Sequence, residues 1–156
     1  MNIRTPNTRL TSKDGSVILS LEAVGREFPS VEEYWDGNWI LFKISFIMPG
    51  LNLEFTDPCV RTDELEGFLE ELKSLSLGHS QVAESVFTEP ILYVYLQASE
   101  PGSDEILGKI DISLFSEEGV GNVSVEMDLN YDCVDTFIRG IEEVLREYPV
   151  LDRDTH

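Results

Sequence analysis

Apolar and polar residues alternate with a period of two in six segments, as in strands that bury one face. In the first, Val17, Leu19 and Leu21 share one face, and Ser20 and Glu22 share the other. The pattern predicts strands over residues 17–23, 40–48, 51–55, 92–98, 106–114 and 123–129. The last three predict an antiparallel meander, and residues 81–90 are a candidate for a further short strand.

Two segments change to a spacing of three and four residues, which predicts amphipathic helices. The first helix begins near Thr62, a candidate N-cap, and ends near Gly78; its apolar stripe is Leu65, Phe68, Leu69, Leu72 and Leu75. Asp132 is a candidate cap for the second helix, which ends before Pro149; its stripe is Val134, Phe137, Ile138, Ile141, Leu145 and Tyr148. Gly67 and Gly140 lie inside these helices, where close packing against the sheet is one explanation.

Strands grouped in runs, rather than alternating singly with helices, indicate an α+β fold. We predict a mainly antiparallel sheet of about six or seven strands, packed with two amphipathic helices. We expect residues 1–14 to form a flexible basic segment, residues 15–150 one domain, and residues 151–156 a C-terminal tail.

The charge is strongly negative. The chain has 30 Asp and Glu against 11 Lys and Arg, a net charge of −19. Residues 1–13 carry +3, so residues 14–156 carry −22. Such a field disfavours nucleic acid and anionic membranes as partners and attracts basic proteins. A second interpretation stays open, in which the acidity only keeps the protein soluble.

We expect a cytoplasmic protein. The N-terminal residues lack the apolar core of a signal peptide, and no apolar run approaches the ~20 residues that span a membrane. Cys59 and Cys133 form no closely spaced disulfide framework, which fits a reducing compartment.

Candidate chemistry is sparse, and we expect no enzyme, metal site or cofactor. A Cys-His pair would have to use Cys59 or Cys133 with His79, without support from the local sequence. Residues 128–132, Asp-Leu-Asn-Tyr-Asp, match the start of a calcium loop, but its sixth and twelfth positions are Cys133 and Arg139 instead of glycine and an acid.

Partner contact is the remaining kind of site. Tyr34 and Trp35 between acidic residues have the composition of an interface hot spot, although ordinary packing is the favoured interpretation of Trp35, and Trp39 is assigned to packing. The acidic helix face of Glu66, Glu70 and Glu71 is a further candidate. The predicted partner-binding residues are Glu32, Glu33, Tyr34, Trp35, Asp36, Glu117 and Glu118.

The succession of several segments resembles the WapI-like immunity proteins of bacterial polymorphic-toxin systems. They are Trp-Asp-Gly-Asn-Trp-Ile (35–40) before a strand, Thr-Asp-Pro-Cys-Val-Arg-Thr-Asp-Glu-Leu (56–65) before a helix, Phe-Thr-Glu-Pro-Ile-Leu (87–92) before a strand, and Asp-Leu-Asn-Tyr (128–131) before a closing helix that ends in Tyr-Pro (148–149). The resemblance covers about residues 15–150. It departs at Cys59-Val60, where a leucine-centred pair is expected, and the basic N-terminal stretch lies outside it.

The resemblance implies a small, cytoplasmic, non-enzymatic protein that neutralises a toxin, commonly a nuclease with a basic surface. Its partner would be this cognate toxin, and the negative charge would steer the two together. The alternatives are an adaptor module for another bacterial protein and a metal-dependent hydrolase built on carboxylates. The sequence leaves open the toxin, the binding face and the oligomeric state.

Overall fold

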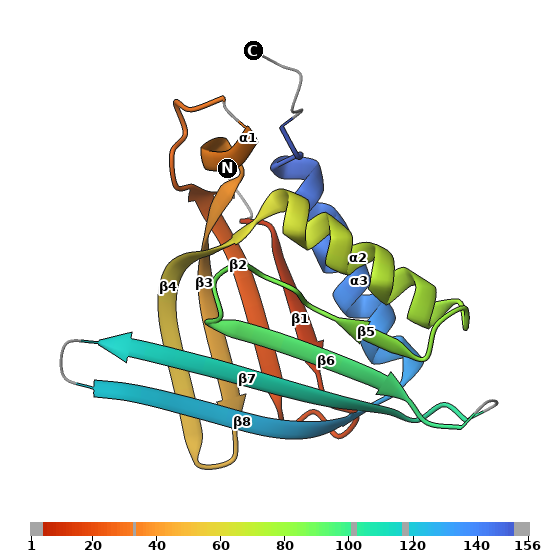
Figure 1. Ribbon diagram of the computed structural model, residues 1–156. Coiled ribbons are helices and arrows are strands. Elements are labelled where there is room, and N and C mark those ends of the chain that lie inside the picture. Colours follow the sequence, from red (N-terminus) through yellow and green to blue (C-terminus); the bar gives the residue numbers. More distant parts are fainter. Residues whose placement is uncertain (1–4, 33, 101–102, 117–118, 152–156) are drawn as a thin grey trace.

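The computed structural model describes residues 5–32, 34–100, 103–116 and 119–151, which form eight strands and three helices (Figure 1). The strands are β1 (Asn7–Thr11), β2 (Ile18–Arg26), β3 (Trp39–Met48), β4 (Leu51–Arg61), β5 (Val82–Glu84), β6 (Leu92–Ala98), β7 (Ile106–Ser116) and β8 (Gly119–Leu129). The helices are α1 (Tyr34–Gly37), α2 (Thr62–Ser76) and α3 (Tyr131–Glu147).

The strands form two antiparallel sheets of four, in the orders β1-β2-β3-β4 and β5-β6-β7-β8. The α+β class is thus confirmed, but the sequence predicted a single sheet with fewer strands and two helices. The division arises because α2 connects β4 to β5 and carries the chain away from the first sheet. In Figure 1 the strands of the two sheets cross, and the second sheet lies nearer the viewer.

We expected residues 1–14 to form a flexible segment, but part of this segment is a strand. Residues 7–11 form β1, which pairs with β2 from Asn7↔Glu22 to Thr11↔Ile18. Leu10 is fully buried, and Thr8 is 3% exposed. The alternation of Thr8 and Leu10 is too short and too polar to stand out in the sequence, so pairing with β2 decides the structure. The remaining domain boundaries stay a prediction.

The core lies between the inner faces of the two sheets and the two long helices. Fully buried residues come from every layer, including Phe42 and Phe46 from β3, Leu96 from β6, Leu72 from α2 and Phe137 from α3. The predicted apolar faces are therefore the buried faces. The sheets are also joined at one edge, where the Lys13 amide donates to the Asp128 carbonyl at 2.7 Å.

Helices α2 and α3 lie side by side (Figure 1). The rings of Phe68 and Phe137 meet edge to face at 6.2 Å, and Lys73 pairs with Glu142 at 3.2 Å. Thus the two amphipathic stripes pack against each other as well as against the sheets.

The predicted helix N-caps are wrong by one or two residues. The N-cap of α2 is Arg61, whose amide donates to Glu64 at 3.3 Å, and Thr62 is the first helical residue. The N-cap of α3 is Asn130, whose side chain accepts from the Cys133 amide at 3.0 Å, whereas Asp132 lies in the first turn. Gly78 does follow the end of α2, with a φ of 78° that suits glycine.

The two helical glycines differ. A Cβ on Gly140 would lie 2.3 Å from Thr8 Oγ1, so glycine lets β1 pass close to α3. At that crossing, Thr8 donates its hydroxyl hydrogen to the Phe137 carbonyl at 2.7 Å. A Cβ on Gly67 would meet nothing within 4 Å. Close packing therefore explains Gly140, and we have no packing reason for Gly67.

Candidate functional site

In the predicted docking segment, Tyr34, Trp35 and Asp36 belong to the short helix α1, and Glu32 lies two residues before it. Glu32 and Asp36 are exposed, and Trp35 is 53% exposed. Glu33, Glu117 and Glu118 lie outside the described residues. In Figure 1, α1 lies at the end of the first sheet opposite the β3–β4 turn.

The aromatic residues of α1 pack against the start of α2. The guanidinium carbon of Arg61 lies 4.4 Å from the centre of the Trp35 ring, within the range of a cation–π contact. The Tyr34 ring meets Trp35 edge to face at 5.0 Å, and its hydroxyl donates to Asp63 Oδ2 at 2.8 Å. Arg61 pairs with the same carboxylate oxygen at 3.0 Å and is only 7% exposed. These contacts hold one face of Trp35 and leave about half of the side chain accessible.

Asn38 holds this end of the molecule together, although no pattern in the sequence predicts a role for it. It is fully buried, and its side-chain oxygen accepts from the Thr62 hydroxyl and from the Leu151 amide, both at 2.9 Å. Its side-chain nitrogen donates to the Tyr34 carbonyl at 2.7 Å. A buried amide with three partners is a strong positional constraint, so α1 has a fixed place relative to α2.

Arg26 adds a second set of links. Its guanidinium donates to the carbonyls of Gly37 at 2.8 Å and Pro149 at 2.7 Å, and it lies 5.8 Å from the centre of the Tyr148 ring. Arg26 and Arg61 are therefore both directed into intramolecular contacts. The exposed side chains of α1 and of the residues before it include acidic Glu32 and Asp36 and aromatic Phe28 and Trp35.

Several acids gather beside α1. The pKa of Glu27 is raised above its ordinary value by burial first and then by the charges of Asp57 and Asp36. The pKa of Asp57 is likewise raised, first by burial and then by Glu89. The α1 surface, as we define it, consists of Glu27, Phe28, Glu32, Trp35, Asp36, Asp57 and Glu89. Within it, Glu27 is repelled by Asp57 and Asp36, and Asp57 is repelled by Glu89.

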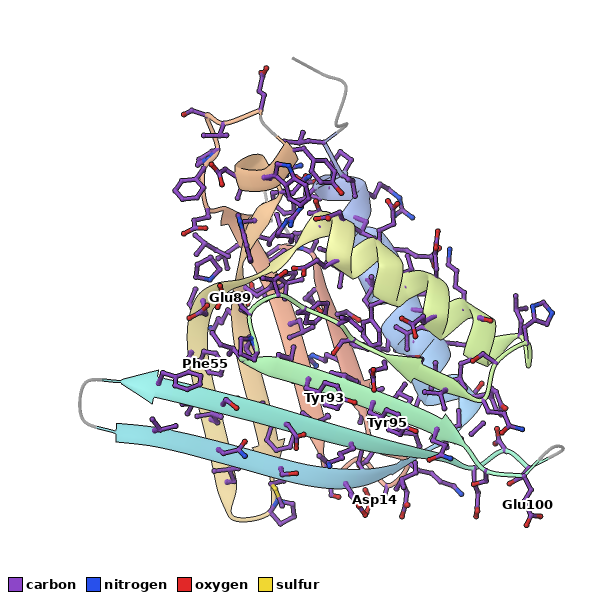
Figure 2. All side chains as sticks on the ribbon, in the orientation of Figure 1. Asp14, Phe55, Glu89, Tyr93, Tyr95 and Glu100 are labelled. Atoms are coloured by element: carbon purple, nitrogen blue, oxygen red, sulfur yellow. The ribbon has the colours of Figure 1, made fainter. Side chains whose placement is uncertain are left out.

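Four of these residues were missed in the sequence. Phe28 follows β2 and is 43% exposed, and Glu27 adjoins it. Asp57 lies on β4, and Glu89, labelled in Figure 2, lies between β5 and β6. The only sequence signal for Asp57 and Glu89 is that each precedes a proline near the boundary of a predicted strand. This signal does not indicate which residues lie near them in the fold.

The outer face of the second sheet is a further acidic surface. It consists of Glu84, Tyr93, Tyr95, Gln97, Leu107, Lys109, Asp111, Ser113, Phe115, Val120, Asn122, Ser124, Glu126 and Asp128. Tyr93 and Tyr95 lie along β6 on the side toward the viewer in Figure 2. The Tyr93 hydroxyl donates to Glu84, and burial, followed by this hydrogen bond, raises the pKa of Tyr93 to about 12. Phe115 and Val120 form an exposed cross-strand pair where β7 and β8 extend beyond β6.

The Cys-His pair and the calcium-loop pattern considered from the sequence gain no support from the structure. Cys59 is fully buried, and burial is the main cause that raises the pKa of its thiol to about 12, so it holds little nucleophilic thiolate near neutral pH. His79 is exposed after α2. Asn130, the third position of the calcium-loop pattern, caps α3 instead. Among the described residues, no group of three or more His, Cys, Asp or Glu side chains is arranged to hold a metal ion.

A groove of about 500 Å³ lies between β1 and α3. Its lining includes Arg9, Arg139 and Arg146 together with Glu143 and Glu147. Its charge is therefore nearly balanced, in contrast to the α1 surface and the outer face of the second sheet.

Comparisons with known proteins place the chain in a family. The family model described as "Immunity protein WapI-like family" matches residues 9–149. No curated protein and no solved structure matches the chain. No helix within the described ranges is long and apolar enough to cross a membrane. Since the match extends over most of the 156 residues, this chain belongs to the WapI-like family of immunity proteins.

Proposed function

We propose that this protein neutralises a cognate toxin domain by binding it, without catalysis, and that the toxin is a nuclease with a basic surface. The observation that carries the proposal is the family match over residues 9–149, because family membership indicates a role in toxin immunity. We place the encounter in the cytoplasm, where a nuclease toxin reaches its substrate.

The charge supports a basic partner. Enzymes that bind nucleic acid present Lys and Arg to the phosphates, so their active surfaces are positive. A chain that carries −22 over residues 14–156 attracts such a surface and competes with nucleic acid for it. Opposite charges raise the association rate, and the effect weakens as salt screens them.

The test is co-expression with the toxin domain encoded beside this gene. We expect the protein to restore growth and to co-purify with the toxin. In a purified assay with RNA and DNA substrates, inhibition should rise linearly with added protein and end at a fixed molar ratio. Continued cell death without a complex would overturn the proposal.

Catalytic inactivation of the toxin would give a different result. A trace of an enzyme would silence a molar excess of toxin, and the toxin would stay inactive after removal of the protein. We expect instead that toxin separated in denaturant and refolded regains its activity with an unchanged intact mass. A permanent change of mass would contradict the non-enzymatic mechanism.

A further inference from the structure

We propose that the α1 surface is where the cationic toxin domain docks, with Trp35 at its centre. This inference rests on the proposed function and adds the binding face. It assigns the predicted residues Glu32, Trp35 and Asp36 together with Glu27 and Phe28, which follow β2, Asp57 of β4, and Glu89 of the segment between β5 and β6.

Trp35 is suited to anchor a partner because it is both accessible and held in place. Tryptophan is enriched among the residues that contribute most to binding. Here one side of the ring rests on buried Arg61, and the Tyr34 ring meets it edge to face. A side chain already restricted in the free protein loses less conformational entropy when it binds.

The negative sign of the exposed charges on the α1 surface favours a cationic partner. Arg26 and Arg61 are engaged with carbonyls, a carboxylate and aromatic rings of the same chain. Glu27 is repelled by Asp36 and Asp57, and Asp57 by Glu89. This repulsion is relieved when Lys or Arg side chains of a partner come near these acids. The negative charge of the α1 surface is complementary to a basic partner, and α1 itself contains no lysine or arginine that would repel such a partner.

Three other surfaces fit a cationic partner less well. On the outer face of the first sheet, Lys43 pairs with Glu54 at 3.4 Å. A groove on this face is lined by Lys43, Arg9 and Glu22, so basic side chains accompany the acid there. The groove between β1 and α3 is lined by three arginines. The outer face of the second sheet is acidic, but its tyrosines are only partly exposed, and Tyr93 is already bonded to Glu84. It is therefore the matched control surface.

The charge test compares two double substitutions that each remove two exposed carboxylates. Glu32→Gln with Asp36→Asn changes the α1 surface, and Glu126→Gln with Asp128→Asn changes the second sheet. With the toxin domain encoded beside this gene, the first pair should slow association about tenfold at low salt, and the second less than about twofold. Equal effects, or a larger effect of the second pair, would overturn the assignment.

The apolar test uses two exposed phenylalanines. Phe28→Ala lies on the α1 surface and Phe115→Ala on the β7–β8 extension, at 43% and 64% exposure. We expect Phe28→Ala to weaken the complex about tenfold and Phe115→Ala less than about twofold. Trp35→Ala should weaken it by about thirtyfold or more. Trp35→Ala also removes a contact of Arg61, so the circular dichroism and thermal unfolding of this variant must be measured. If Trp35→Ala misfolds, the comparison of Phe28→Ala with Phe115→Ala tests the docking face.

The outcomes separate the two proposals. If the unaltered protein neither binds nor protects, the proposed function fails. If it does both while the α1 variants behave like their controls, only the docking face is wrong. If sedimentation finds a dimer that Phe28→Ala dissociates, the surface belongs to a second copy of this chain, which also overturns the assignment.

Discussion

Asn38 and Thr62, which are 24 positions apart, are joined by two hydrogen bonds. The Thr62 amide donates to the Asn38 carbonyl at 2.8 Å, and the Thr62 hydroxyl donates to the Asn38 side-chain oxygen at 2.9 Å. The pair connects the end of α1 to the first turn of α2. The position of Trp35 over Arg61 depends on this connection.

Asn38→Ala should therefore destabilise the protein by about 2 to 3 kcal/mol, because it leaves buried donors and acceptors without partners. Urea unfolding monitored by circular dichroism measures the change. Asn52→Ala, at an exposed position of β4, is the control and should stay within about 0.5 kcal/mol of the unaltered protein. Equal stability of the two variants would contradict the role of Asn38.

The two helical glycines should respond to alanine in opposite directions. Gly67→Ala should stabilise the protein by about 0.5 to 1 kcal/mol, since alanine favours helix and the site is open. Gly140→Ala should destabilise it by about 1 to 3 kcal/mol, because the new methyl group overlaps Thr8. Thermal and urea unfolding measure both. A stabilising Gly140→Ala would mean that β1 does not approach α3 as described.

Asp57→Asn should stabilise the folded protein at pH 7. The folded-state pKa of Asp57 lies above its ordinary value of 3.8, so folding favours the protonated carboxyl. The resulting stabilisation is present below pH 3.8 and is lost as the pH rises through the raised pKa. The unfolding midpoint of the variant should exceed that of the unaltered protein at pH 7 and match it at pH 3. Asp128→Asn controls for net charge; an equal gain there would contradict a local cause.

Tyr93 should titrate late in alkali. Burial first, and then its hydrogen bond to Glu84, raise its pKa from 10.0 to about 12. The stabilisation linked to the protonated hydroxyl is therefore present below pH 10 and is lost as the pH rises toward 12. Absorbance at 295 nm follows the phenolates, and Tyr93→Phe should remove a step centred near pH 12. In Glu84→Gln, that step should move to lower pH. A Tyr93 step near pH 10 in the unaltered protein would contradict the prediction.

Local patterns predicted most elements because burial of one strand face or one helix stripe imposes a period on the sequence. Even the short strand β5 falls within the predicted residues 81–90. The failures are instructive. Strand β1 offers only Thr8 and Leu10 as inward residues, and the helix caps depend on backbone angles that Thr62 or Asp132 could have adopted equally well.

The candidate surface was predictable only in part. Acids beside Tyr34 and Trp35 indicated a docking segment, but nothing local places Arg61 under Trp35, since the two are 26 positions apart. Asp57 comes near Glu27 through the pairing of β4 with β3, and Glu89 comes near Asp57 through the return of the chain after α2. Binding of the toxin by the α1 surface, rather than by the second sheet, stays a prediction.

By itself, the sequence determined the α+β class, most strands, both long helices, the negative charge and the family resemblance. Each of these follows from residue type and from neighbours within a few positions. Tertiary structure alone decided the division into two sheets, the place of β1, and the packing of Trp35 on Arg61. Those features depend on contacts between distant residues, whose free energy is set by the packing of the whole core rather than by any one segment.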